Sequence, residues 1–195
     1  TPGETQGLYH PDEHPGPAYQ RANRALAWLT ARILRMRGVA IPDPAVETGL
    51  AAAWLPGRFQ VVRENPTVIL DGAHNREAAA ALASSLRDGF GDRRTLFVIG
   101  QMGRHAAEGL VAELAPLASV IIATQPTSGG GHPAEHIAAI AEGLGVRSEV
   151  LTPPMASLRR ALELAGKDDV VVVTGSFYVV GEIDVDALTT ARSAD

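Results

Sequence analysis

The residues best suited to chemistry in this 195-residue chain lie within residues 56–75. The apolar and β-branched run at 67–70 (TVIL) is too short for a helix and predicts a buried strand. The pentapeptide at 71–75 (DGAHN) follows directly, and an alanine-rich segment follows it. In open α/β sheets, ligands bind where a strand ends and the next helix begins, and free N–H groups at a helix N-terminus favour an anion. This placement predicts an anion-binding site in which Asp71 and His74 do the chemistry.

A structural interpretation of the same residues stays open beside the functional one. Asp-Gly pairs are common in turns, so Asp71 could be an ordinary turn residue. Asn75 stands where a helix N-cap is expected, and its amide oxygen suits that role. The full pentapeptide, downstream of Gly57-Arg58-Phe59, favours the functional interpretation.

Composition narrows the classes of protein to consider. Apolar residues make up 46% and charged residues 20% of the chain, which is typical of a globular protein. The net charge of -5 argues against a nucleic-acid or anionic-membrane partner. The chain has no cysteine, which excludes a disulfide scaffold, a cysteine nucleophile and thiolate metal ligands. We find neither a membrane-length apolar run nor a signal-peptide pattern, so the expected compartment is the cytoplasm.

Proline and glycine dominate residues 1–17, which are expected to form a loose linker or tail. His10 and His14 flank two acidic residues there, but nothing predicts a framework that would hold a metal, and no metal site is expected.

From residue 18 onward, helical and strand patterns alternate. Their order predicts a Rossmann-like α/β domain with an open, mainly parallel sheet and helices on both faces, preceded by a short helical segment. Right-handed crossovers would bring the strand ends at Asp71, Gln101, Thr124 and Ser176 to one edge. Helices are expected at 18–37, 44–55, 75–89, 105–117, 133–144, 154–165 and about 184–191, and strands at 57–70 (a pair), 94–100, 119–124, 147–151, 169–174 and, as an edge strand, 178–180.

The chain contains neither a Gly-x-x-x-x-Gly-Lys-Ser/Thr loop nor a Gly-x-Gly-x-x-Gly motif. Its glycine triplet at 129–131 is followed by His132 and Pro133, and predicts a flexible loop instead. Any nucleotide handled here therefore needs another segment to hold its phosphates.

Three blocks carry a resemblance to a known family: GRFQVV at 57–62, P-x-VILDGAHN at 66–75 and TGSFYVVGEI at 174–183. Together they resemble the C-terminal domain of folylpolyglutamate synthase/dihydrofolate synthase, within the Mur ligase superfamily. The resemblance covers roughly residues 18–188. It implies that 18–55 is a helical remnant of the central ATP-binding domain and that 56–195 is the Mur ligase C-terminal, glutamate ligase domain.

The family's reaction, as the resemblance implies it, forms an amide with ATP. A carboxylate of dihydropteroate or a folate is phosphorylated to an acyl phosphate, which the amine of glutamate then attacks. The implied cofactors are ATP and Mg²⁺, held mainly by a P-loop central domain, which is the implied partner. The chain by itself is therefore expected to be inactive.

The resemblance also implies roles for single residues. Asn23, in a run similar to Gly-x-His-Gln-x-x-Asn-Ala-x-x-Ala, would contact adenine, and Arg58 would reach ATP. Asp71 would meet the ribose hydroxyls or the phosphates. His74 and Asn75 would lie beside the same nucleotide, and Ser176 would bind the incoming glutamate.

Two stretches depart from the family's pattern. Its Asp-Lys-Asp run is replaced here by 101–105 (QMGRH), where Arg104 is the nearby cation. Its Pro-Arg-Ala run is replaced by 131–134 (GHPA), where His132 is a cation only when protonated. An alternative function is therefore a degenerate, non-catalytic nucleotide-binding or regulatory module of the same fold, and a coincidental match on a generic doubly wound domain is a third possibility.

Overall fold

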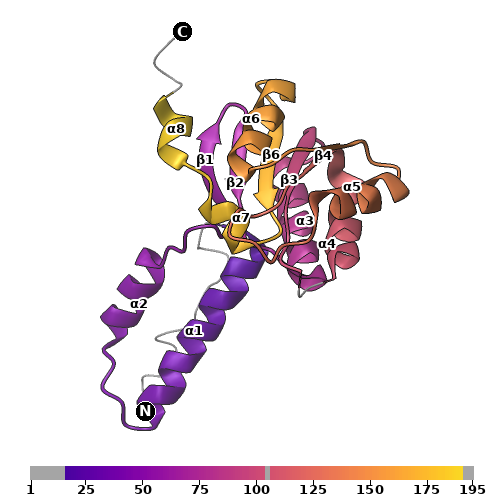
Figure 1. Cartoon of the computed structure of the whole chain (residues 1–195). Coiled ribbons are helices and arrows are strands. Elements are labelled where there is room, and N and C mark those ends of the chain that lie inside the picture. The colour runs from indigo at the N-terminus through magenta and orange to yellow at the C-terminus, as the bar shows by residue number, and fades with distance from the viewer. Residues whose placement is uncertain (1–15, 104–105, 191–195) are drawn as a thin grey trace. The chain divides into compact units, whose positions relative to one another are not determined.

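The computed structural model describes residues 16–103 and 106–190. It divides into two units, Thr1–Leu55 and Pro56–Asp195, which are treated separately below (Figure 1). His10, His14 and most of the expected tail lie outside the described residues.

The first unit contains two helices, α1 (Ala18–Met36) and α2 (Asp43–Ala52). Each begins directly after a proline, whose fixed φ suits the start of a helix. Both helices match the expected ones closely, although α2 ends three residues early. Neither contains a buried residue, and the exposed apolar side chains include Leu26, Leu29, Ile33 and Met36.

The second unit is built on a six-stranded sheet in the order β1-β2-β6-β3-β4-β5. Strand β1 pairs antiparallel with β2, and every other pair is parallel. The strands are β1 (Gln60–Glu64), β2 (Thr67–Leu70), β3 (Thr95–Ile99), β4 (Ala118–Ala123), β5 (Ser148–Val150) and β6 (Val170–Thr174).

Helices cover both faces of this sheet (Figure 1). One face packs against α3 (Arg76–Phe90), α4 (Ala107–Leu114) and α5 (Ala134–Gly143). The other packs against α6 (Pro154–Leu164), α7 (Phe177–Gly181) and α8 (Val185–Thr190). The expected α/β class, with a mainly parallel sheet between two helical layers, is thus confirmed.

Alternate strand residues supply the two halves of the core. Ile69 and Val172 pack on the α3 side, whereas Val68 and Val171 pack on the α6 side. Strands β2, β3 and β6 are buried along their whole length. This is why they contain continuous apolar runs: a parallel strand covered on both faces has no solvent side to make polar.

One expected element is wrong. Residues 178–180 were predicted as an edge strand because aromatic and β-branched residues favour strands, but they lie in helix α7. Gly175, at φ +100°, turns the chain after β6, and the Ser176 hydroxyl accepts a hydrogen bond from the Tyr178 N–H at 3.1 Å. This N-cap begins a short helix that buries Val179 and Val180 against the sheet.

No helix in the described ranges is both long and apolar enough to cross a membrane.

Candidate active site

The loops that follow β2 and β6 are hydrogen-bonded to each other at the carboxyl edge of the sheet. The backbone N–H of Asp71 donates to the Val173 carbonyl at 3.0 Å, and that of Gly175 donates to the Ala73 carbonyl at 2.9 Å. Two motifs about 100 residues apart in the chain therefore meet, as the predicted crossovers require.

Gly175 is required for this meeting. Its φ of +100° is disfavoured for other residues, and a Cβ here would lie 2.5 Å from the Gly100 carbonyl oxygen at the end of β3. The backbones of the β6 and β3 ends can approach only because no side chain lies between them.

Asp71 is 2% exposed, and both of its carboxylate oxygens accept backbone hydrogen bonds. Oδ2 accepts from the Phe59 N–H at 2.8 Å and Oδ1 from the Ala73 N–H at 2.9 Å. The Gly72 N–H also donates to the Gly57 carbonyl at 2.8 Å. Asp71 thereby fastens the Gly57-to-Phe59 segment to the DGAHN loop. Its expected contact with ribose or phosphate stays a prediction, and what the structure shows is a hydrogen bond to the backbone amide next to Arg58.

The hydrogen bond to Asp71 holds Phe59 in an unusual backbone conformation. Its φ of +50° is uncommon for a non-glycine residue, and its amide is the one that Asp71 binds. Its ring lies 6.3 Å from that of Phe90, centroid to centroid. Buried hydrogen bonding and ring packing together hold a conformation that the isolated tripeptide would avoid.

His74 is half-buried in the same loop, and its Nδ1 lies 3.0 Å from the Gly72 carbonyl. A carbonyl only accepts, so Nδ1 is the donor in this contact. The backbone carbonyl of His74 accepts from Gln101 Nε2 at 2.8 Å.

The two remaining polar candidates in this unit act as helix caps. Asn75 accepts a hydrogen bond from the Ala78 N–H at 2.8 Å at the start of α3, and Ser176 caps α7 and is 3% exposed. The cap role of Asn75 is the one that the structural interpretation predicted. Binding of the nucleotide by Asn75 and of glutamate by Ser176 stay predictions.

Arg58 lies on the ring of Phe177, with its guanidinium carbon 4.6 Å from the ring centroid. The sequence singled out Arg58 but not Phe177, which belongs to the TGSFYVVGEI block. The signal that could have found it is the unusual placing of a large aromatic side chain directly after a strand-end turn. The other predicted residue, Asn23, lies on α1 of the first unit with its side chain exposed.

Gln101 and Thr124 are two further residues that sequence reasoning placed at this edge without giving them a role. Both are fully buried at the ends of β3 and β4. Gln101 Oε1 and Thr124 Oγ1 are buried with no hydrogen-bond partner among the described residues. That these two atoms are unsatisfied could not be predicted from the sequence, because a hydrogen bond depends on which atoms of distant segments come within reach.

The glycine triplet at 129–131, expected to form a flexible loop, is paired with the segment after β3. The backbone N–H of Gly103 donates to the Gly130 carbonyl at 2.9 Å, and the backbone N–H of His132 donates to the Gln101 carbonyl at 2.8 Å. The ring centroids of His132 and His136 lie 5.2 Å apart. Arg104, the cation expected nearby, lies outside the described residues. Within the described ranges, three or more His, Cys, Asp or Glu side chains nowhere gather as a metal site would require.

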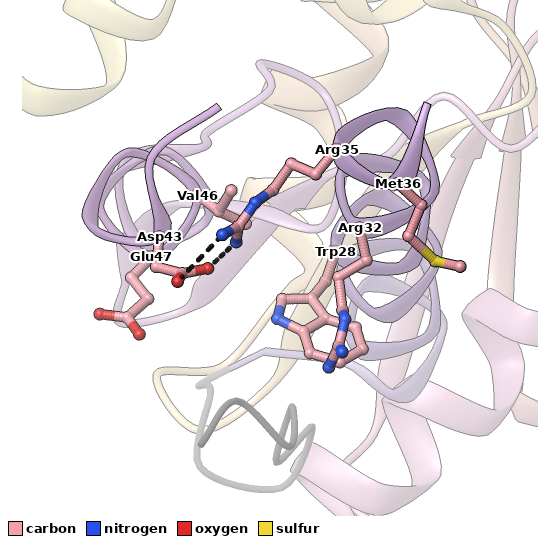
Figure 2. Close-up of a pocket in the computed structure, with 7 residues that line it drawn as sticks. All are labelled: Trp28, Arg32, Arg35, Met36, Asp43, Val46 and Glu47. Carbon is pink, nitrogen blue, oxygen red and sulfur yellow. Dashed lines mark hydrogen bonds and ion pairs between the residues drawn. The ribbon is translucent and has the colours of Figure 1, made fainter. Parts of the chain in front are cut away.

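A separate pocket of about 680 Å³ lies between α1 and α2 of the first unit (Figure 2). The Arg32 guanidinium lies 5.0 Å above the Trp28 ring, and Arg35 pairs with Asp43 across the pocket. Its remaining lining residues are Met36, Val46 and Glu47.

Comparison with known proteins gives the family of this chain. The model of the Mur ligase glutamate ligase domain matches residues 57–177, more than half of the chain. A probable bifunctional folylpolyglutamate synthase/dihydropteroate synthase of Haloferax volcanii is 39% identical over 166 residues, which are 85% of this chain and 19% of that protein.

Solved structures agree with the sequence comparison. The E. coli FolC structure in complex with DHPP and ADP aligns with a TM-score of 0.79 at 29% identity, covering 98% of this chain and 44% of that one. A bifunctional folylpolyglutamate synthase/dihydrofolate synthase from Yersinia pestis, complexed with AMPPNP and Mn ion, aligns with a TM-score of 0.68 at 29% identity, covering 83% and 37%. The chain spans less than half the length of each of these relatives. The GRF, DGAHN and TGS motifs are joined by hydrogen bonds at one edge of the sheet. The chain belongs to the Mur ligase family, and its residues 57–177 match that family's glutamate ligase domain.

Proposed function

We propose that this chain is the C-terminal part of an ATP-dependent ligase that adds glutamate to dihydropteroate or a folate. The observation that carries the proposal is the hydrogen-bonded junction of three motifs. Asp71 binds the amide after Arg58, and Ala73 binds the amide before Ser176. The relatives named above are synthases of this class, and one of them was solved with ADP.

Arg58 is the proposed phosphate contact. A guanidinium offers planar donors that suit phosphate oxygens. The buried carboxylate of Asp71 fixes the backbone beside Arg58 and so aims the arginine. His74, whose Nδ1 lies 3.0 Å from the Gly72 carbonyl, is proposed to lie beside the same nucleotide.

Amide formation then follows two balanced steps. The substrate carboxylate oxygen attacks the γ-phosphorus of ATP and releases ADP, which gives an acyl phosphate. The amine of glutamate attacks the acyl carbon, loses a proton and expels inorganic phosphate. We assign the glutamate carboxylate to the turn at Ser176, where a hydroxyl and backbone N–H groups lie together.

The chain has no phosphate cradle of its own, so a P-loop central domain is the proposed partner. Mg²⁺ is assigned to that partner, and a divalent ion accompanies the nucleotide in the Yersinia pestis structure. We propose that residues 18–55 are the end of the central domain. The division after Leu55 and the exposed apolar stripe of α1 support this, because such a stripe normally packs against further chain. Asn23 is then the proposed adenine contact, and the cytoplasmic compartment stays a prediction.

The residues that follow β3 and β4 favour the alternative function, a non-catalytic nucleotide-binding module. The family's Asp-Lys-Asp run is absent there, and Gln101 Oε1 and Thr124 Oγ1 are buried without a hydrogen-bond partner within residues 16–103 and 106–190. The two functions differ in whether glutamate is consumed.

The test combines this chain with the P-loop domain from the same source and measures ADP release that depends on ATP, glutamate and dihydropteroate. We expect release from the pair and none from either part alone. In the pair, Arg58→Ala is expected to lower kcat/KM for ATP by at least tenfold, since charged hydrogen bonds are worth about 1.5–3 kcal/mol.

Arg63→Ala is the matched control, because Arg63 lies five residues further along, in β1, and among the described residues its side chain bonds locally, to the Asn65 carbonyl at 3.0 Å. It should leave kcat/KM within twofold. Folded parts that together bind ATP but release no ADP would replace the ligase with the non-catalytic alternative.

A further inference from the structure

Phe177 is a large aromatic residue that stays 42% exposed at the carboxyl edge, beside the residues of the proposed function. It is the first residue of α7, so the Ser176 cap that begins this helix also fixes where the Phe177 side chain starts. Nothing in the reaction proposed above uses it. A half-exposed ring at a site edge needs an explanation, because burying it would stabilise the fold.

Two glycines on other segments lie against this ring. A Cβ on Gly72 would lie 2.5 Å from ring carbons of Phe177, and one on Gly57 would lie 3.3 Å away. The DGAHN loop and the GRF segment both therefore leave out a side chain where the ring packs. The Phe177 ring thus packs against the backbones of two motifs.

Arg58 lies over the same ring at 4.6 Å, a distance typical of a cation–π contact. A cation held over an aromatic face samples fewer positions than an unrestrained side chain. The planar N–H groups of a guanidinium are the donors that suit phosphate oxygens, so restricting the guanidinium also restricts where those donors can lie.

We infer that Phe177 is a positioning residue, which holds the Arg58 guanidinium by cation–π stacking in the orientation that nucleotide binding requires. This deepens the proposed function and rests on it. The ring links the three motifs: it is part of the TGSF block, packs on the DGAHN loop and carries the arginine of GRF.

The contact itself can be tested on the 195-residue chain. In the NMR spectrum, the Arg58 Nε–Hε signal, assigned by its loss in Arg58→Ala, should be shifted upfield by the ring current. Phe177→Leu should abolish that shift while keeping an apolar side chain over Gly72. Tyr178→Leu, which removes the neighbouring exposed aromatic, should leave it unchanged. An Arg58 signal that is the same in the parent and Phe177→Leu chains would overturn the inference.

The functional test uses the pair with the P-loop domain and replaces Phe177 with phenylalanines of increasing fluorine content. Fluorination weakens the negative face of the ring with little change of shape, so a purely structural ring would tolerate it. We expect the KM for ATP to rise stepwise by roughly two- to fivefold in total, the range of an exposed cation–π contact, and the KM for glutamate to stay constant.

The outcomes separate the inference from the function on which it rests. An inactive unsubstituted pair overturns both. An active pair that responds to Arg58→Ala but not to fluorination keeps the ligase function and overturns the role of Phe177.

Discussion

The two halves of the carboxyl edge are built differently. Where β2 and β6 end, Asp71 uses both carboxylate oxygens, and Asn75 and Ser176 each cap a helix. Where β3 and β4 end, Gln101 Oε1 and Thr124 Oγ1 are buried without partners among the described residues. The first half holds the motifs typical of the family, and the second holds the stretches that depart from it.

This difference distinguishes a region that is held in shape by its own hydrogen bonds from one in which some buried polar atoms are left unsatisfied. A fully bonded loop keeps its geometry before any ligand arrives, which suits residues that must aim a charge. Unsatisfied buried atoms cost stability and call for a bound group or a functional reason. We therefore expect substitutions in the first half to lower the free energy of unfolding strongly, and substitutions in the second half to change it little.

Gly175→Ala should have the largest effect. Its Cβ would meet the Gly100 carbonyl at 2.5 Å in a backbone conformation with φ +100°, and a backbone atom cannot rotate away. We expect a loss of about 3–5 kcal/mol in the free energy of unfolding, measured with urea. Gly89→Ala in α3 has open space around it and should stabilise by up to about 1 kcal/mol. Equal effects at the two glycines would contradict the close approach of β6 and β3.

Asp71→Ala comes next. It leaves the Phe59 and Ala73 amides without their acceptor, at a cost of about 2–4 kcal/mol. Asp71→Asn keeps one acceptor oxygen and should cost about half as much. Asp88→Ala, on the exposed face of α3, should change the unfolding free energy by less than about 0.5 kcal/mol. An Asp71→Ala chain with an unchanged free energy of unfolding would show that the first half does not depend on the Asp71 carboxylate.

Thr124→Val and Thr174→Val compare the halves directly. Both threonines are fully buried at strand ends, but Thr174 Oγ1 lies 3.5 Å from the Ala73 carbonyl, whereas Thr124 Oγ1 has no hydrogen-bond partner in the part of the chain that the structure describes. Thr124→Val should stabilise by about 1 kcal/mol and Thr174→Val should destabilise by about 0.5 kcal/mol, both by thermal and urea unfolding. If Thr124→Val destabilises instead, a bound group satisfies that hydroxyl and the contrast between the halves disappears.

The smallest expected effect lies on the edge strand β5. Hydrogen bonds from Arg160 and Arg147, at 2.8 Å each, lower the pKa of Glu149 below its ordinary value of 4.5. A lowered folded-state pKa stabilises the fold above the ordinary value, and this stability is lost as the pH falls through the folded value. Exposed ion pairs contribute little, so the change should be small and sensitive to salt.

The measurement compares unfolding of the parent chain and Glu149→Gln between about pH 3 and pH 6. The two curves should converge toward low pH and separate above 4.5. Curves that stay parallel through this range would show that the cluster does not act through the Glu149 carboxylate.

The sequence predicted much of the fold and part of the site. Periodicity and apolar runs located the helices and strands within a few residues, because burial on both faces dictates composition directly. The exception is 178–180, where the Ser176 cap prevailed over strand propensity. Asn75 was recognised as a cap by its position alone.

Residue types and order thus determined the α/β class, the strand ends that share an edge and the motifs that mark the family, since all of these follow from local pattern and handed connections. The tertiary structure alone decided what each side chain does there. It buried Asp71 between two backbone segments that its carboxylate joins, and it laid Arg58 on Phe177. It also left Gln101 Oε1 and Thr124 Oγ1 without hydrogen-bond partners among the residues that the structure describes. These outcomes depend on distances between segments far apart in the chain, which no local pattern encodes.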